Sequence, residues 1–316
     1  MTYHHAAEAT EYVSSQLRTI GYWLSAVKCC DYSGVYPFQP LVGLLGCTGY
    51  QMASLHTIAE NGFTDGMMYD MHRPSYTSES IKYILDYIGE AGKRADDVEY
   101  DVLELGAGTG KFTQKFLQFK PKTTRYLATE PMPEFLTTLR TELPGLETRQ
   151  CRADDIPLPD SSVRAVVVAQ AFHWFADDES MQEIWRVLVP MGKLILIWNC
   201  KDNSKGWLGQ CEGLRTKYCD SHSTHYSAFK WREKLNEFKG FRQNEHLYLP
   251  GIKFQGPKSL MVGRFASSSW ISSLTEGKRK KALDKINDIL NTDPDTRDAK
   301  IICMPMLTDL YYYAKC

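Results

Sequence analysis

The sequence has no surplus of basic charge. Its 37 lysines and arginines are balanced by 38 aspartates and glutamates, which gives a formal net charge of −1. Proteins that bind nucleic acids or anionic membranes mainly by electrostatics carry a basic surplus, so we expect neither kind of partner. The one basic run, Lys278-Arg-Lys-Lys281, has no interleaved aromatic residues and is more typical of a solvated helix face.

A long apolar stretch is also missing. A membrane-spanning helix needs about 18 or more consecutive apolar residues, and the run Leu41-Val-Gly-Leu-Leu-Gly46 is much shorter than that. The first residues, Met1-Thr-Tyr-His-His5, lack the basic region and apolar core of a secretory signal. We therefore expect a protein that neither spans a membrane nor carries a secretory leader.

The nine cysteines include no Cys-x-x-Cys pair. Cys211 and Cys219 lie near His222 and His225, but their spacing matches no zinc motif, so we expect no metal site. An odd number of irregularly spaced cysteines is typical of free thiols in a reducing compartment, which favours a cytoplasmic location.

The most informative segment is Val102-Leu-Glu-Leu-Gly-Ala-Gly-Thr-Gly-Lys-Phe-Thr113. An apolar run predicts a buried strand, three glycines follow at alternate positions, and helix-forming residues come next. Glycine lets the backbone bend and approach a ligand where a Cβ would clash, so this order predicts a nucleotide-type site. A phosphate-binding P-loop is disfavoured because Leu105 and Phe112 replace the required glycine and hydroxyl residue. A dinucleotide loop is disfavoured because the third glycine comes one residue early. A nucleoside ligand without phosphates fits better.

Strands and helices alternate after this loop. Strands are predicted at residues 101–105, 126–129, 147–152, 165–169, 194–198 and 246–254, with an antiparallel last strand at 310–314. Apolar strands that alternate with helices are typical of an α/β fold with a doubly wound, mostly parallel sheet, which binds ligands at the carboxyl ends of its strands. Residues 201–245 are expected to be mostly helical. We also expect a turn at Pro190-Met-Gly192 and a capping box at Ser273-Leu-Thr-Glu276 that begins a helix.

Several segments in this order resemble a known family. The segments Glu104–Gly110, Thr129–Pro131, Ala153–Asp160 and Leu188–Lys193 are similar to those of class I S-adenosylmethionine-dependent methyltransferases. Arg73-Pro-Ser-Tyr76 and Gln170-Ala-Phe-His-Trp-Phe175 resemble the small-molecule, trans-aconitate-type branch known as methyltransferase type 11. The resemblance implies a Rossmann-like core at residues 56–200 and a C-terminal part at 201–316 that combines a helical substrate cap with the last strands. Residues 1–55 match nothing in the family, and we expect an N-terminal extension there that is helical or poorly ordered.

The family resemblance implies S-adenosylmethionine as the cofactor. The candidate cofactor-binding residues are Glu104, Gly106, Ala107, Gly108, Thr109, Gly110, Glu130, Pro131, Met132, Ala153, Asp154, Gln170 and Ala171. Glu130 lies at the sequence distance from the loop at which a strand-end acid reaches a ribose. Asp154 is favoured as the adenine-side acid, although a plain turn acid, Asp155 and Asp160 remain alternatives. Two positions depart from the family pattern: Cys151-Arg152 and Arg164.

The resemblance also indicates the substrate side of the site. The candidates there are Tyr69, Arg73, Tyr76, Trp174, Trp198 and Asn199. His173 either acts on the acceptor, as a general base or by hydrogen-bonding a substrate carboxylate, or is a packed histidine that orients its loop. The segment 263–270 resembles a family segment that covers the substrate.

The expected function is S-adenosylmethionine-dependent methyl transfer to a small-molecule acceptor. A carboxylate would need no base near neutral pH because its unperturbed pKa is about 4, while hydroxyl, amine and thiol acceptors also stay open. The alternatives are a catalytically silent binding protein with the cofactor fold, and a nicotinamide-dependent oxidoreductase. Nothing in the sequence indicates an oligomeric state.

Overall fold

The computed structural model describes residues 73–89, 98–204, 206–218 and 230–316. The predicted extension at 1–55, the candidate Tyr69 and the residues Cys219, His222 and His225 lie outside these ranges. The described strands are β1 (Tyr100–Leu105), β2 (Tyr126–Thr129), β3 (Thr148–Arg149), β4 (Val163–Ala169), β5 (Leu188–Lys201), β6 (Phe241–Gly256) and β7 (Ile302–Lys315). The described helices are α4 (Ser78–Gly89), α5 (Lys111–Leu117), α6 (Pro133–Glu142), η1 (Phe172–Trp174), α7 (Asp178–Val187), α8 (Gly206–Tyr218), α9 (Lys230–Glu237), α10 (Lys258–Ala266), α11 (Ser269–Ser272) and α12 (Glu276–Thr292).

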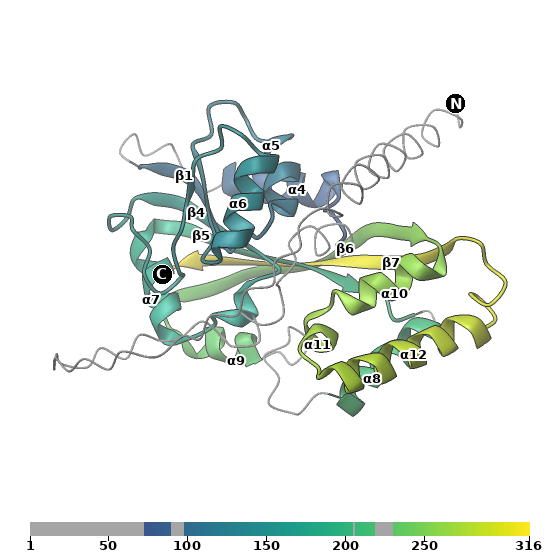
Figure 1. Cartoon of the computed structure of the whole chain (residues 1–316). Coiled ribbons are helices and arrows are strands. Elements are labelled where there is room, and N and C mark those ends of the chain that lie inside the picture. The colour runs from purple at the N-terminus through teal and green to yellow at the C-terminus, as the bar shows by residue number, and fades with distance from the viewer. Residues whose placement is uncertain (1–72, 90–97, 205, 219–229) are drawn as a thin grey trace, which may run out of the picture. The chain divides into compact units, whose positions relative to one another are not determined.

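The described strands form one seven-stranded sheet in the order β3-β2-β1-β4-β5-β7-β6 (Figure 1). Strands β1 to β5 pair in parallel, and β7 is antiparallel to both of its neighbours, β5 and β6. All residues of β1 and β2 are buried, because parallel strands joined by helical crossovers are covered on both faces. The predicted doubly wound sheet with an antiparallel last strand is confirmed.

Two layers of helices cover the sheet. On one face α4, α5 and α6 contribute apolar side chains such as Ile84, Phe116 and Leu139 to a core that includes β1, β2 and β4. On the other face α7 and α9 contribute Ile184 and Trp231 to a second core. Helices alternate with the strands and pack on the two faces of the sheet. The carboxyl ends of β1, β2 and β4 are therefore the edge at which this kind of fold binds ligands.

A third core supports four helices that we call the cap: α8, α10, α11 and α12. They pack around buried side chains that include Trp207, Phe265 and Ile286. Pairing between β5 and β7 ends at Lys201 opposite Met306, but β6 and β7 continue as a two-stranded ribbon to Gly256 opposite Ile302. Figure 1 shows the cap helices along this end of the β6–β7 ribbon. The extension of β6 and β7 beyond β5 therefore connects the cap to the sheet.

Three local predictions were wrong. The segment Pro190–Gly192 belongs to β5, where it forms a bulge between the Leu188–Val163 and Lys193–Ala165 pairs, with Met191 at φ 63°. Residues 241–245, expected to be helical, open β6 because they pair with β7. Helix α12 begins after Thr275, which makes no side-chain cap, and the Ser273 hydroxyl donates to the Trp270 carbonyl instead.

In the ranges that the structure describes, we find no helix with the length and hydropathy that a bilayer crossing requires.

The pairing of β6 with β7 shifts register between Pro250 and Lys253, and this bulge generates a prediction about stability. A Cβ at Gly251 would lie 2.6 Å from the carbonyl oxygen of Met306 and 2.9 Å from the amide nitrogen of Leu307, and both are backbone atoms that cannot rotate away. We expect Gly251→Ala to lower the free energy of unfolding by about 1–3 kcal/mol, as other overpacked sites do. Thermal unfolding followed by circular dichroism measures the change.

The matched control is Gly213→Ala. Gly213 is exposed within α8, and its Cβ would meet no atom within 4 Å. This variant should be neutral or more stable by about 0.5–1 kcal/mol, because alanine loses less backbone entropy in a helix. Equal melting temperatures for Gly251→Ala and the wild type would contradict the steric argument.

Candidate functional site

A cavity opens at the carboxyl ends of β1, β2 and β4. Its volume is about 190 Å³, counted as space open to the centre of a water molecule. One water needs about 10–15 Å³ of such space, so the cavity has room for an organic ligand. The sequence-predicted residues that line it are Arg73, Tyr76, Gly106, Ala107, Gly108, Thr109, Glu130, Pro131, Met132, Ala153, Asp154, Gln170, Ala171 and Trp174.

The glycine loop leaves β1 with a backbone that only glycine adopts readily. Gly106, Gly108 and Gly110 have φ angles of 68°, 59° and 94°, in the left-handed region. A Cβ at Gly106 would lie 2.8 Å from the Cβ of Ala171, and one at Gly110 would lie 2.6 Å from Leu139 Cδ1. A Cβ at Gly108 would meet nothing within 4 Å. Gly108 therefore leaves space beside the backbone for a ligand, whereas Gly110 is the N-cap of α5 and does not line the cavity.

Glu130 fixes the loop from the end of β2. Its Oε2 accepts the backbone N–H of Gly108 at 2.8 Å, and its Oε1 accepts the N–H of Met132 at 3.0 Å. The residue is 4% exposed and lines the cavity. Burial raises the pKa of the Glu130 carboxyl to about 7, against the two N–H donors, which favour the ionised form. Backbone N–H groups thus hold both oxygens of the Glu130 carboxylate in place on the cavity wall, where the carboxylate can accept hydrogen bonds.

Glu104 lies beneath the loop and does not line the cavity. Its Oε2 accepts hydrogen bonds from the hydroxyls of Thr113, at 2.6 Å, and Tyr126, while Oε1 has no hydrogen-bond partner among the described residues. The side chain is fully buried, and burial raises its pKa to about 7, with a further increase from Glu130. In this structure Glu104 ties α5 to β2 rather than facing a ligand.

The adenine-side candidate Asp154 is held by its neighbour. Arg152 Nε donates to Asp154 Oδ1 at 2.8 Å and Nη2 donates to Oδ2 at 2.9 Å, a two-pronged contact that keeps the pKa of Asp154 below its usual value. Cys151 and Arg152 also line the cavity, so the first departure from the family pattern lies in the site itself. The second, Arg164, is 3.7 Å from Asp101, a contact between β4 and β1.

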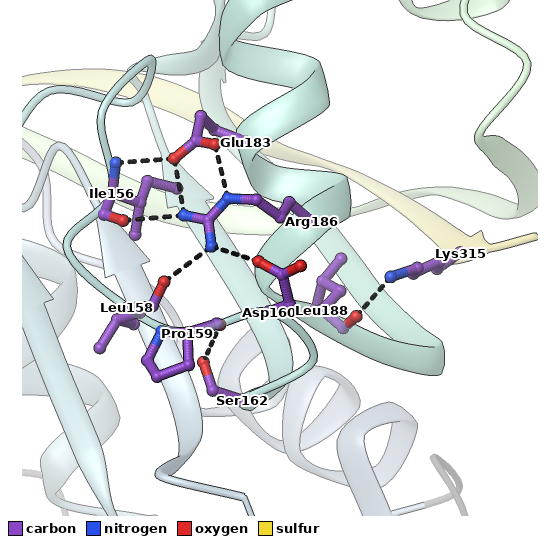
Figure 2. Close-up of polar contacts among 9 residues, drawn as sticks. All are labelled: Ile156, Leu158, Pro159, Asp160, Ser162, Glu183, Arg186, Leu188 and Lys315. Atoms are coloured by element: carbon purple, nitrogen blue, oxygen red, sulfur yellow. Dashed lines mark hydrogen bonds and ion pairs between the residues drawn. The ribbon is translucent and has the colours of Figure 1, made fainter.

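The segment after Asp154 is fastened to α7 (Figure 2). The Arg186 guanidinium donates to the carbonyl oxygens of Ile156 and Leu158 and to the carboxylates of Asp160 and Glu183. Glu183 in turn accepts the N–H of Ile156 at 3.0 Å. Because these bonds begin only two residues after Asp154, they restrict where the segment that carries Asp154 can lie.

The end of β4 brings Gln170, Ala171 and Trp174 to the cavity. Gln170 has a φ of 62°, a strained value for a residue other than glycine, and its side chain donates to the Asn199 carbonyl at 3.3 Å. His173 points elsewhere: its Nδ1 accepts the indole N–H of Trp198 at 3.2 Å, and neither residue lines the cavity. With Nδ1 engaged as an acceptor, the structure favours the packed-histidine interpretation of His173.

Residues 73–76, which we call the N-terminal segment, contribute Arg73, Pro74 and Tyr76 to the cavity wall. Tyr76 is 4% exposed and packs edge-on against Phe112, with ring centroids 5.2 Å apart. The Asn199 side chain does not line the cavity but donates to the carbonyl of Ser75 at 2.9 Å, so it positions this segment.

The sequence did not single out several lining residues as ligand contacts. The most notable are Phe135, Asp177, Ser180 and Arg264. Asp177 begins α7 and accepts the N–H of Ser180 at 2.8 Å, a common helix N-cap that a pattern search could have found. Arg264 belongs to the cap and is far in sequence from the other lining residues. The only indication of its role in the sequence was the resemblance of the segment 263–270 to a family segment. No group of three or more metal-binding side chains occurs in the part of the chain that is described, and the five described cysteines are free thiols.

The buried carboxyls of Glu104 and Glu130 make the free energy of unfolding depend on pH. A carboxyl whose pKa rises on folding stabilises the fold only while protonated, so stability is lost as pH rises from 4.5 to about 7. For Glu104 the loss at pH 8 is about 3 kcal/mol. We expect Glu104→Gln to be more stable than the wild type at pH 8 and to show a weaker fall in melting temperature between pH 5 and pH 8.

Glu142→Gln is the control for the pH experiment, because Glu142 is exposed at the end of α6. It should keep the wild-type pH dependence. A Glu104→Gln curve parallel to that of the wild type would show that Glu104 is not the titrating group.

Comparison with known proteins supports the family assignment. Residues 103–196 match a family model described as a methyltransferase domain. An uncharacterized methyltransferase-like protein of Schizosaccharomyces pombe is 34% identical over 231 residues, which cover 73% of this chain and 86% of the relative. An uncharacterized methyltransferase of Mycobacterium tuberculosis is 31% identical over 240 residues, 76% of this chain and 89% of the relative.

A solved structure agrees on the fold. A protein named as a type II methyltransferase from Anaeromyxobacter dehalogenans superposes with a TM-score of 0.57 at 20% identity, covering 77% of this chain and 97% of that one. Sequence relatives across most of the chain, the matching domain and the shared fold lead to one conclusion. This chain belongs to the class I S-adenosylmethionine-dependent methyltransferases, in their type 11 branch.

Proposed function

We propose that this protein binds S-adenosylmethionine in the cavity and methylates a small-molecule acceptor, with a carboxylate as the acceptor group. The observation that carries the proposal is the Glu130 carboxylate, held by two backbone N–H groups beside the open face of Gly108. A cis-diol such as ribose donates two hydroxyl protons, and a carboxylate with both oxygens fixed is suited to accept them.

The other wall residues fit the remaining parts of a nucleoside. Pro131, Met132 and Phe135 provide an apolar surface for a base next to Glu130, and Ala153 and Asp154 lie at the same side of the cavity. The left-handed turn at Gly108 lets a ligand approach the backbone. The predicted roles of these residues in binding the cofactor belong to this proposal.

The bound cofactor supplies a methyl group on a sulfonium, which is electrophilic without further activation. The protein's task is then to hold the acceptor in line and to exclude water. The described carboxylates that line the cavity already have partners: Glu130 binds two backbone N–H groups, Asp154 binds Arg152, and Asp177 caps α7. His173 accepts from Trp198. An acceptor that needs no deprotonation, such as a carboxylate, therefore suits this site best.

The expected cytoplasmic location and the absence of nucleic-acid and membrane partners stay predictions. They rest on the free thiols and on the balanced charge.

Cofactor binding can be tested with two glycine variants that share the same backbone strain. Gly108 and Gly145 both have positive φ angles, 59° and 85°, and neither Cβ would meet an atom within 4 Å, but only Gly108 lines the cavity. We expect Gly108→Ala to weaken the binding of S-adenosylhomocysteine at least tenfold in calorimetric titrations. Gly145→Ala should bind as the wild type does. Equal affinities of both variants for S-adenosylhomocysteine would contradict cofactor binding in this cavity.

Transfer can be tested with cofactor labelled on its methyl group and a metabolite extract. We expect labelled small molecules whose label is released as volatile methanol by mild alkali, because methyl esters hydrolyse and methyl ethers, amines and thioethers do not. Label that survives alkali would reject the carboxylate acceptor. No transfer at all, despite tight binding of S-adenosylhomocysteine, would favour a silent binding protein, and displacement by NAD would favour an oxidoreductase.

A further inference from the structure

The cap places a cationic side chain in the cavity wall. Arg264 lies in the last turn of α10 and is 5% exposed. Among the described residues that line the cavity, it is the one contributed by the cap. Its neighbours Met261 and Phe265 are fully buried in the core of the cap, so the helix face that carries Arg264 is turned inward. Packing thus fixes the helix face that carries Arg264.

A second guanidinium fixes the end of the same helix. Arg73 also lines the cavity, and its Nη2 donates to the carbonyl oxygen of Ser267 at 2.7 Å, immediately after α10. The Ser267 hydroxyl donates to the Arg264 carbonyl at 3.0 Å. Two arginines distant in sequence therefore meet the cavity at one place, where the N-terminal segment contacts the cap.

The surroundings of Arg264 are rich in positive charge. Burial lowers the pKa of Lys201, and the nearby Arg264 lowers it further, while the paired Glu212 opposes both effects. Arg215 lies 3.8 Å from the same glutamate. The positive charges of Arg264 and Lys201 would attract an anion bound in the cavity. Arginine suits this task because its planar fork binds a carboxylate or phosphate through two parallel hydrogen bonds.

The chemistry of transfer decides which group of the acceptor Arg264 should hold. When a carboxylate attacks a sulfonium, the negative charge of the reacting oxygen disappears as the new O–CH₃ bond forms and the S–CH₃ bond breaks. A guanidinium on that oxygen would stabilise the reactant more than the transition state and would slow the reaction. A guanidinium on a second, unreactive anion keeps the same attraction throughout and only orients the acceptor.

We propose that Arg264 determines the specificity of the enzyme by binding an anionic group, carboxylate or phosphate, that is separate from the methylated atom of the acceptor. The acceptor is then a small molecule with at least one negative charge that survives methylation. This proposal rests on the proposed function, because it needs methyl transfer in the same cavity.

The test uses the full-length protein, methyl-labelled cofactor and a metabolite extract split by an anion exchanger into a retained and a flow-through fraction. We expect label to be transferred only to molecules of the retained fraction, and the labelled products should again bind the exchanger. Pretreatment with alkaline phosphatase separates the two anions: it abolishes labelling when the group is a phosphate ester and leaves labelling unchanged when it is a carboxylate.

Three variants assign the effect to Arg264. Arg264→Gln should reduce labelling at least tenfold while its affinity for S-adenosylhomocysteine and its melting temperature stay near those of the wild type. Arg264→Lys, which keeps the charge without the fork, should recover part of the activity. Arg279→Gln is the control, because exposed Arg279 donates to carbonyls of Ser272 and Leu274 within the cap and does not line the cavity. It should label as the wild type does.

Each other outcome has a distinct meaning. Labelled products that no longer bind the exchanger, or equal labelling by Arg264→Gln and the wild type, overturn the role of Arg264 and leave the methyltransferase assignment in place. Arg264→Gln with weakened binding of S-adenosylhomocysteine would make Arg264 part of the cofactor site and also overturns the proposal. Absence of both label and cofactor binding in the wild type overturns the proposed function and this inference with it.

Discussion

The site depends on one carboxylate that bridges two turns. Glu130 accepts the N–H of Gly108 from the turn after β1 and the N–H of Met132 from the turn after β2. The parallel register of the two strands, with Leu105 opposite Thr129, brings these turns side by side. A buried carboxylate with two fixed donors is rigid, because leaving either N–H without an acceptor would cost about 1–3 kcal/mol. The shape of the loop and the position of the acid therefore form a single unit.

Side chains of both charge signs line the cavity. On the proposed cofactor side Glu130 binds the glycine loop, and Asp154 has its charge compensated by Arg152. On the proposed acceptor side Arg73 and Arg264 come from the N-terminal segment and from the cap. The net charge of −1 for the whole chain does not reveal these local charges. In the proposed reaction a positively charged donor and a negatively charged acceptor must lie in fixed places.

Left-handed backbone conformations occur at two strand ends that border the cavity. Gln170 adopts a left-handed backbone conformation at the end of β4, and the three loop glycines do so after β1. Arg186 holds the segment after Asp154 on α7 through two carbonyls and two carboxylates (Figure 2). Such strained conformations persist only where surrounding contacts fix them. The departures from the family pattern at Arg152 and Arg164 are explained by their contacts with Asp154 and Asp101.

The sequence alone determined the parallel half of the sheet, the glycine loop and most of the cavity wall, because these follow from local patterns: apolar runs, glycines and strand-end acids. Strand β2 was predicted with its observed bounds of 126–129. Tertiary structure decided the bulge in β5, the length of β6, the burial of Glu104 beneath α5 and the arrival of Arg264 in the cavity. Each of these features depends on contacts between residues distant in the chain, and the local patterns of one sequence do not show which distant residues will be in contact.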